Sequence, residues 1–198
     1  MTTPAASVTG VVIPVRGFAD GFARLAGRLD ADGRARLARR LADCAVDAAA
    51  ELPVVVVSSA PDVRAWADER GLERIDDPRS LDEAADAGRE RVRALGCARV
   101  VVVHADLPRL RSLAEMTTDE HRPVAALVAC HRGDGTPVLS VPVAAPFRFA
   151  YGPGSFRRHE EHARGAGLTV RVVRDPDLAF DVDEPQDLDA LAAEIPQG

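Results

Sequence analysis

The 198-residue chain contains no lysine, so all 25 of its basic residues are arginine. Any anion that it binds must therefore be met by planar guanidinium groups instead of a compact ammonium group. Aromatic residues make up only 4% of the chain, so valine, alanine and leucine must fill its core. The three cysteines (Cys44, Cys97 and Cys130) are odd in number and widely spaced. We expect them to be small buried side chains in a reducing cytosol, which argues against a disulfide or a zinc site.

The sequence also lacks segments that would place it in a membrane or direct it out of the cell. No run of about 20 apolar residues is present to span a bilayer. The N-terminal stretch MTTPAASVTG has neither the basic nor the apolar region of a secretory signal. The net charge of −6 argues against a general nucleic-acid binder. We therefore expect a cytoplasmic protein without nucleic-acid or membrane partners, folded as one domain over residues 1–198.

Apolar runs alternate with helical patterns in the first half of the chain. The expected strands are Val11–Val15, Val54–Val57 and Arg99–His104, and the expected helices run from about Gly33 to Ala50, from Pro61 to Gly71 and from Ser80 to Gly96. Trp66 falls on the apolar stripe of the second helix, so we expect it in the core. This alternation predicts an α/β fold with three layers, α/β/α, around a mainly parallel central sheet.

The second half has a different pattern. Two strand-like runs, Val124–Cys130 and Val138–Val141, flank a turn at residues 132–135, which predicts a small antiparallel element. We further expect a polar helix over Phe156–Arg164, strands at Leu168–Val173 and Ala179–Val182, and a last helix from Pro185. His159 and His162 are expected on the solvated face of the polar helix.

Two apolar segments stop abruptly at carboxylates, Asp106 in VVVVHADLP and Asp181 and Asp183 in AFDVDEP. A buried strand that ends in aspartate delivers a charge to the sheet edge, where α/β folds place their ligands. Asp181 and Asp183 should point the same way on an extended backbone, because side chains alternate along a strand. Together the three could hold one hard divalent cation. The alternative is helix capping, since a proline follows both Asp106 and Asp183 within two residues.

The loop from Arg16 to Arg24 lies between the first expected strand and the first expected helix, where nucleotide-binding α/β folds place phosphate. Gly17 and Gly21 allow the backbone to approach a ligand closely, and Arg16 and Arg24 could pair with phosphate oxygens. The loop matches neither of the common glycine-rich nucleotide motifs. An ordinary glycine-bearing connection with solvated arginines is therefore equally compatible with this pattern.

Two further turns combine glycine with a hydroxyl group. Residues 133–136 (GDGT) present Thr136, and residues 152–155 (GPGS) present Gly152 and Ser155 just before the polar helix. A helix N-terminus favours an anion such as phosphate or carboxylate. An ordinary turn and an ordinary helix cap would show the same sequence pattern. Asp82 could meet the edge of a nucleotide base, but its place in a capping box explains it equally well.

Six segments in this order resemble the guanylyltransferases that act on 2-phospholactate or phosphoenolpyruvate in making the deazaflavin coenzyme F-420. They are PVRGFADGFARL at 14–25, LDEA at 81–84, HADLP at 104–108, GDGT at 133–136, YGPGSFRRH at 151–159 and FDVDEPQDL at 180–188. The resemblance implies a nucleotide-diphospho-sugar transferase-like fold that binds GTP and Mg²⁺. It further implies attack of the substrate phosphate on the α-phosphorus of GTP and release of pyrophosphate.

The resemblance also assigns roles to the candidate residues. It implies metal binding by Asp106, Asp181 and Asp183, and acceptor binding by Thr136, Gly152 and Ser155. It implies nucleotide binding by Arg16, Gly17, Gly21 and Arg24, to which the possible base contact of Asp82 is added. Catalysis is expected of Asp106, Arg16 and Arg24. A homodimer is also expected.

The first loop departs from the family at Phe22, near which its members usually carry a lysine. An apolar ring cannot neutralise phosphate charge, so one alternative is a non-catalytic relative that binds a nucleotide or a partner protein. A second alternative is a nucleotidyltransferase that uses another phosphorylated acceptor.

Overall fold

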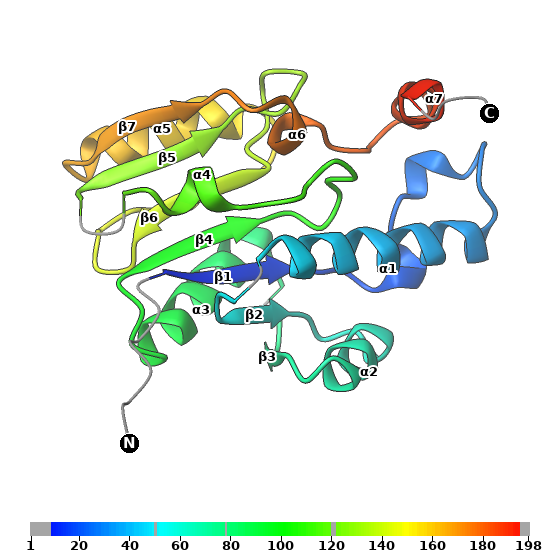
Figure 1. Ribbon diagram of the computed structural model, residues 1–198, viewed down its shortest axis with the longest axis horizontal. Coiled ribbons are helices and arrows are strands. Elements are labelled where there is room, and N and C mark those ends of the chain that lie inside the picture. Colours follow the sequence, from blue (N-terminus) through cyan, green and yellow to red (C-terminus); the bar gives the residue numbers. More distant parts are fainter. Residues whose placement is uncertain (1–8, 50, 78, 120–121, 195–198) are drawn as a thin grey trace.

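The computed structural model describes residues 9–49, 51–77, 79–119 and 122–194 (Figure 1). Its strands are β1 (Thr9–Pro14), β2 (Val54–Val57), β3 (Glu73–Ile75), β4 (Arg99–Val103), β5 (Val124–Val128), β6 (Val138–Pro142) and β7 (Thr169–Val173). They form one seven-stranded sheet in the order β3-β2-β1-β4-β6-β5-β7. Within this sheet β6 alone is antiparallel to its neighbours β4 and β5. The predicted mainly parallel sheet with a small antiparallel element is confirmed.

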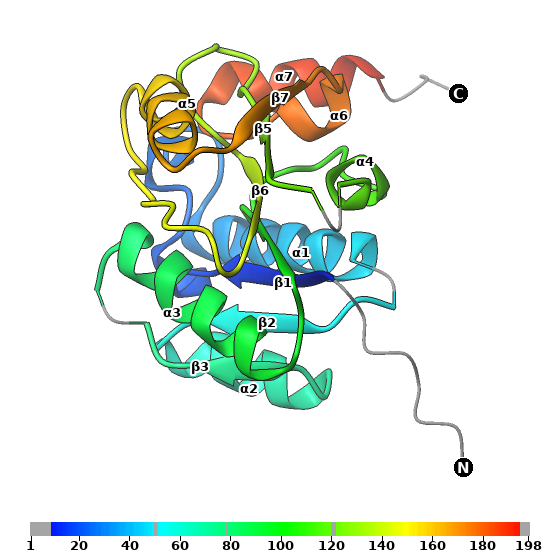
Figure 2. The same ribbon diagram turned by 90° about the vertical axis from the view of Figure 1, so that its left-hand side faces the viewer.

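Helices cover both faces of the sheet (Figure 2). One face packs against α1 (Ala31–Ala48), α2 (Pro61–Glu69), α4 (Ala114–Thr117) and α6 (Pro176–Ala179). The other face packs against α3 (Leu81–Ala94) and α5 (Ser155–Gly165). Trp66 is buried in the first of these two cores, as predicted. The helix α7 (Pro185–Glu194) lies apart from the layers, above the short 3₁₀ turns η1 (Phe18–Asp20) and η2 (Ala23–Leu25) that follow β1 (Figure 1).

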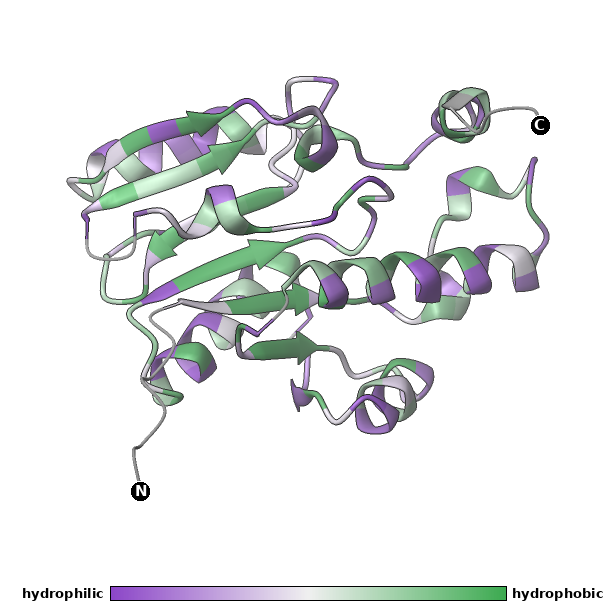
Figure 3. Ribbon diagram, viewed as in Figure 1, coloured by the Kyte–Doolittle hydropathy of each residue, from purple (hydrophilic) through white to green (hydrophobic). Residues whose placement is uncertain are grey.

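The central strands are valine-rich and buried on both sides, which is why their apolar residues run without alternation (Figure 3). Along β1, Val11 and Ile13 enter the core beneath α1 and α2, whereas Val12 enters the core beneath α3. Each central strand therefore contributes to two cores, and both must be covered by helices.

Local capping sets the starts of the two long helices. The side chain of Asp30 accepts a hydrogen bond from the backbone N–H of Gly33 at 2.7 Å and starts α1. Ser80 accepts from the N–H of Glu83 at 3.2 Å, and the two side chains also contact each other, so the predicted capping box opens α3. The first helix ends at Ala48, and its predicted end, Ala50, lies outside the described residues.

The strand order places a topological switch point between β1 and β4. The chain leaves β1 toward β2 and β3 on one side and later returns to β4 on the other side. The carboxyl ends of these four parallel strands meet at one edge of the sheet, which is where open α/β sheets bind ligands. The loop after β1 and the Asp106 segment after β4 therefore face the same space.

One expected strand is wrong. Residues 179–182 were expected to be a strand, but Ala179 ends the short helix α6, and residues 180–183 form no ladder. Their backbone makes isolated contacts instead, such as the N–H of Val182 to the carbonyl of Asp106 at 2.9 Å. Conversely, residues 73–75, which carry no strong strand pattern, form the edge strand β3. No helix within the described ranges is long and apolar enough to cross a membrane.

Candidate active site

A cleft of about 640 Å³ opens at the carboxyl ends of β1 and β4. The loop after β1 lines one wall, the segment between β3 and α3 lines a second, and residues 104–106 and 182–183 complete it. All four residues predicted in the first loop for nucleotide binding line this cleft: Arg16, Gly17, Gly21 and Arg24. The sequence therefore located this wall of the cleft without a recognisable glycine motif.

The first loop is tightly folded at its glycines. A Cβ on Gly17 would lie 2.9 Å from Oδ2 of Asp20 and 3.3 Å from Cβ of Ala60, so a larger residue there would displace the Asp20 side chain and crowd Ala60. Phe22 follows with a φ of +56°, a left-handed conformation that is uncommon for non-glycine residues. Its ring lines the cleft and packs against the apolar cluster of Leu25, Phe180 and Val182. Phe22 thus anchors the loop onto the C-terminal segment.

Three arginines and no lysine line the cleft: Arg16, Arg24 and Arg79. Arg79 was not singled out from the sequence, because it precedes the capping box in an irregular stretch with no recognisable pattern. It has a φ of +124°, and its N–H donates to Oδ1 of Asp77 at 2.9 Å. A strained non-glycine backbone beside a cleft is typical of ligand-binding positions.

Asp106 lies at the end of the cleft beside the second acidic segment, because the N–H of Val182 donates to its carbonyl. Its Oδ1 is buried and has no hydrogen-bond partner among the described residues. Burial, followed by the nearby charges of Asp181 and Asp183, raises the pKa of Asp106 to about 7. The capping alternative for Asp106 is wrong, since the residues after it form turns and no helix starts there.

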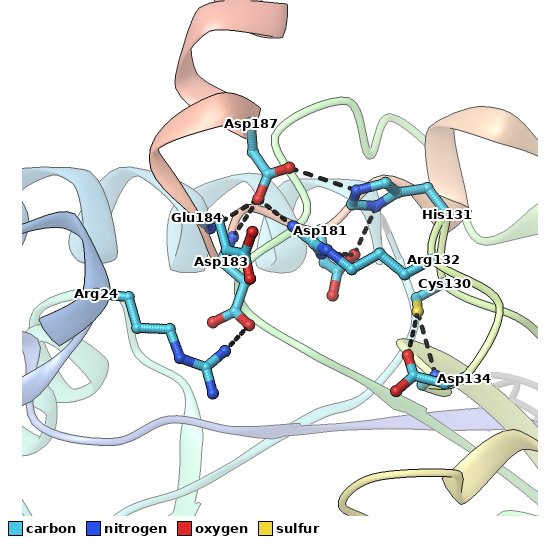
Figure 4. Close-up of polar contacts among 10 residues, drawn as sticks. Arg24, Cys130, His131, Arg132, Asp134, Asp181, Asp183, Glu184 and Asp187 are labelled. Carbon is cyan, nitrogen blue, oxygen red and sulfur yellow. Dashed lines mark hydrogen bonds and ion pairs between the residues drawn. The ribbon is translucent and has the colours of Figure 1, made fainter.

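The other two predicted metal ligands lie close by but have different partners (Figure 4). Asp183 lines the cleft and forms an ion pair with Arg24, both side chains being about half exposed or more. Asp181 instead contacts Nδ1 of His131 at 2.8 Å and Nη1 of Arg132 at 3.5 Å. The two carboxylates are therefore not presented together, as the strand prediction assumed, because no neighbouring strand holds this segment in a pleat.

Asp187, which the sequence reasoning missed, organises this acidic segment (Figure 4). Its buried carboxylate accepts hydrogen bonds from the N–H groups of Asp183 at 2.8 Å and Glu184 at 2.7 Å. It also pairs with Arg132 at 2.5 Å and lies 3.4 Å from Nε2 of His131. Burial alone would raise the pKa of Asp187. The backbone donors and Arg132 outweigh this effect, so the pKa is lowered. The carboxylate of Asp187 therefore binds the free N–H groups at the start of α7. The alternative in which Asp183 caps this helix is wrong.

The donor chemistry at this end of the cleft suits a hard divalent cation. Asp106 and Asp183 offer carboxylate oxygens, and the unpartnered Oδ1 of Asp106 leaves buried acceptor capacity that a cation would satisfy. In the described part of the chain, no three carboxylate, thiol or imidazole groups are arranged to hold a metal ion. In this structure the carboxylate of Asp183 forms an ion pair with Arg24 instead.

Two of the predicted acceptor-binding residues, Thr136 and Ser155, form a second, buried unit, whereas Gly152 is exposed. The hydroxyl oxygens of Thr136 and Ser155 lie 3.2 Å apart, and each residue is only 2% exposed. The N–H of Phe156 donates to the carbonyl of Asp134 at 3.0 Å, and that of Ser155 to Gly152 at 3.0 Å. The structure thus joins the two glycine-bearing turns, but these hydroxyls are not among the groups lining the cleft. The first two amides of α5 already have partners, so they do not contribute to the open anion site that was expected.

Two further expectations concern residues around this unit. His159 is fully buried, so its predicted place on a solvated face is wrong; contacts with Thr136 and Ala150 hold it inside. Asp82 is not among the cleft-lining residues, because its Oδ1 accepts from the N–H of Tyr151 at 2.5 Å. Asp82 therefore holds the second glycine-bearing turn against α3, and its contact with a base stays a prediction.

A switch-point cleft with a tight, arginine-bearing first loop and two acidic segments at its far end defines a nucleotidyltransferase of the α/β class. Solved structures agree on the fold. A nucleotide-diphospho-sugar transferase from Desulfovibrio desulfuricans superposes with a TM-score of 0.76 at 16% identity, over 96% of this chain and 90% of that one.

The sequence narrows this class to one family. The model of the family described as "Guanylyl transferase CofC like" matches residues 9–194, and the chain belongs to this family. A phosphoenolpyruvate guanylyltransferase from Sphaerobacter thermophilus is 36% identical over 96% of this chain and 95% of its own length. A 2-phospho-L-lactate guanylyltransferase from Natronomonas pharaonis is 38% identical over 83% and 76%, respectively. The resemblance seen in the sequence is confirmed, and the protein is a nucleotidyltransferase enzyme.

Proposed function

We propose that the protein transfers GMP from GTP to phosphoenolpyruvate or 2-phospho-L-lactate, depends on Mg²⁺ and releases pyrophosphate, as a step in coenzyme F-420 biosynthesis. The observation that carries this proposal is the buried Oδ1 of Asp106, which has no partner among the described residues and lies in the cleft with Asp183 and the arginine-bearing loop. The names of the relatives support the choice of guanylyl donor and of a phosphorylated three-carbon acid.

The triphosphate of GTP would lie along the first loop. Arg16 and Arg24, with Arg79 on the facing wall, supply guanidinium groups that bind phosphate oxygens in a bidentate manner. Gly17 and Gly21 let the loop backbone approach the phosphates. Three arginines in one cleft provide the positive charge that a lysine-free chain must obtain from guanidinium groups.

Asp106 and Asp183 would hold Mg²⁺, and Asp181 would become a third ligand on leaving its contacts with His131 and Arg132. The ion supplies neutralisation of phosphate charge where the α- and β-phosphates separate. The chain's own contribution is to keep these carboxylates close together: the bond from Val182 to Asp106 joins the two segments, and Asp187 fixes the backbone of Asp183.

The reaction itself requires little acid–base chemistry. An oxygen of the acceptor phosphate attacks the α-phosphorus of GTP in line, a new P–O bond forms, and the bond to the bridging oxygen of pyrophosphate breaks. The attacking phosphate is already ionised, so no strong general base is needed. Arg16 and Arg24 act by stabilising the charge that develops on the departing pyrophosphate.

The acceptor is placed at Thr136, Gly152 and Ser155. The Thr136–Ser155 pair can donate one hydrogen bond to an anionic oxygen. Gly152 has a φ of +98°, a conformation that a side chain would strain, so the turn requires glycine at this position. A small phospho-acid carries both a phosphate and a carboxylate for such donors.

Pyrophosphate release tests the proposal directly. The purified protein is mixed with Mg²⁺, with GTP, ATP, CTP or UTP, and with each phospho-acid in turn, and the product is identified by mass. GTP with one of the two acids should release pyrophosphate and yield the guanylylated acid, and EDTA should abolish the reaction.

A pair of variants tests the acidic segment in the same assay. Asp183→Asn should lose activity, whereas Asp189→Asn, at an exposed ion pair with Arg28 in the following helix α7, should retain it. The absence of pyrophosphate with every pair of substrates would contradict the proposal. Light scattering on the same sample checks the expected homodimer.

A further inference from the structure

A buried chain of hydrogen bonds runs through the unit formed by the two glycine-bearing turns. The backbone N–H of Ala150 donates to Nε2 of His159 at 2.9 Å. Nδ1 of His159 lies 3.0 Å from the hydroxyl oxygen of Thr136, which in turn lies 3.2 Å from that of Ser155. His159 is 0% exposed, so water does not compete for these bonds.

The first of these bonds sets the direction of the rest. A backbone N–H can only donate, so Nε2 of His159 must accept and carries no proton. A neutral imidazole has one N–H, which is therefore at Nδ1 and donates to Thr136. Burial, with smaller contributions from His162, Arg158 and His104, lowers the pKa of His159 to about 3, which keeps the ring neutral in the physiological range.

Ring packing holds the imidazole in this orientation. The ring of Tyr151 meets it edge to face at 4.8 Å between centroids, and the ring of Phe147 lies at 5.7 Å. A ring flip would exchange each nitrogen with a ring carbon, and it would set the N–H of Ala150 against a carbon atom of the ring. The tautomer and the rotamer are therefore specified by the same surroundings.

The direction of these hydrogen bonds leaves one hydroxyl hydrogen free in the Thr136–Ser155 pair. The N–H of His159 and the two hydroxyl groups supply three hydrogens, and the two bonds among them use two. One hydroxyl hydrogen is left over, on Ser155 if Thr136 donates to it or on Thr136 if Ser155 donates. With the opposite tautomer Thr136 would donate to His159 and Ser155 to Thr136, and no hydrogen would remain.

We propose that His159 is a positioning residue for the acceptor: it forces the Thr136–Ser155 pair to present one hydroxyl donor to the anionic substrate. The inference rests on the proposed function, which places the phosphorylated acid at these two hydroxyls. His159 itself does not touch the acceptor. Its contribution is to make the hydroxyl pair a net donor, which an anion needs and a neutral ligand would not.

Steady-state kinetics with a matched pair of variants tests this role. Asparagine can place an amide N–H near the position of Nδ1, whereas glutamine carries its amide farther out, toward Ala150. We expect His159→Gln to raise the KM for the acceptor about tenfold while leaving the KM for GTP unchanged, the loss typical of a misdirected bond to a charged group. His159→Asn should restore most of the acceptor affinity. His162→Gln is the control, because it changes a histidine on the same helix that contacts the carbonyl of Arg148 and the ring of Phe147 but neither hydroxyl group.

Several results would overturn the proposal. An unchanged acceptor KM in His159→Gln would do so, as would a parallel change for both substrates or an equal loss in His159→Asn. Those last two outcomes indicate a purely structural role. If the wild-type protein shows no guanylyl transfer at all, the proposed function fails first.

Nitrogen NMR of the ¹⁵N-histidine-labelled protein gives a readout that needs neither substrates nor a folded variant. His159 should show a single neutral tautomer protonated at Nδ1 and unchanged from pH 5.5 to 8.5. A tautomer protonated at Nε2, a mixture of tautomers, or titration within that range would refute the direction of the chain.

Discussion

Replacing Asp106 by asparagine tests the electrostatics at the end of the cleft. Its carboxyl group has a buried Oδ1 without a partner among the described residues. Burial, together with the charges of Asp181 and Asp183, raises its pKa from the ordinary 3.8 to about 7. Asparagine has nearly the same shape and no charge, so it removes this penalty while keeping the packing. The folded protein should therefore become more stable as it loses activity.

The sign and size of the effect follow from proton linkage. Below pH 3.8 the carboxyl group is protonated in both the folded and the unfolded states, so the substitution should change stability little. As the pH rises, the unfolded state loses its proton first, and the free energy of unfolding of the wild type falls until the pH passes about 7. At about 1.4 kcal/mol for each tenfold difference in proton affinity, the penalty has an upper bound of about 4 kcal/mol.

Urea unfolding in EDTA between pH 4 and pH 9 measures this difference. Asp106→Asn should exceed the wild type by about 2–4 kcal/mol above pH 7 and match it near pH 4. Asp32→Asn, an exposed control in the first turn of α1, should follow the wild type throughout. Adding Mg²⁺ should stabilise the wild type at high pH and leave Asp106→Asn unchanged. A variant that is less stable than the wild type at pH 8 in EDTA would refute the reasoning, because the carboxylate would then be a satisfied group.

Three further changes test other parts of the molecule. Arg24→Gln should raise the KM for GTP about tenfold, because it removes a proposed phosphate-binding group. It should not shift the unfolding midpoint, since the ion pair of Arg24 is exposed. Arg39→Gln, at an exposed ion pair outside the cleft, should change neither the KM nor the midpoint. Gly88→Ala should lower the free energy of unfolding by about 1–3 kcal/mol, because its Cβ would lie 2.3 Å from a methyl group of Val12. Gly165→Ala, whose Cβ meets nothing within 4 Å, should be neutral or stabilising in the same measurement. Asp187→Asn should raise the Mg²⁺ concentration needed for half-maximal velocity, because it weakens the charged acceptor that fixes the backbone of the acidic segment.

The parallel half of the fold was predictable because its signals are local. The run of four valines at Val54–Val57 is a strand with the predicted bounds. The capping box at Ser80 opens α3 as expected, since a cap depends on residues only three positions apart. The positions of the loop after β1 and of Asp106 then follow from the rule that parallel strands meet at their carboxyl ends.

The environment of His159 was not predictable in the same way. The helix that carries it is rich in charged residues, so its pattern indicates a solvated helix. Its buried stripe consists of Ser155, His159 and Ala163, which are four residues apart but are small or polar instead of apolar. Contacts with Thr136, Ala150 and the rings of Phe147 and Tyr151 make that stripe an interior one, and such contacts leave no period in the sequence.

The acidic segment shows a related limit. Residues 180–183 alternate apolar and acidic side chains as a strand would, but no neighbouring strand pairs with them. Alternation predicts which residues are buried, and Phe180 and Val182 are indeed buried. It does not predict where the carboxylates point, because their partners, His131 and Arg24, belong to distant parts of the chain.

The same alternation explains how the cationic loop and the acidic segment come together. Leu25 of the loop and Val182 of the acidic segment belong to one buried apolar cluster. Arg24 directly precedes Leu25 and Asp183 directly follows Val182, so burial of the apolar pair brings the two charges to the rim of the cleft, where they pair. The apolar contact therefore sets the geometry, and the exposed ion pair adds little stability of its own. An anion that engages Arg24 takes away the partner of Asp183 without disturbing the apolar cluster, so a triphosphate in this cleft leaves Asp183 available to a cation while the fold stays intact.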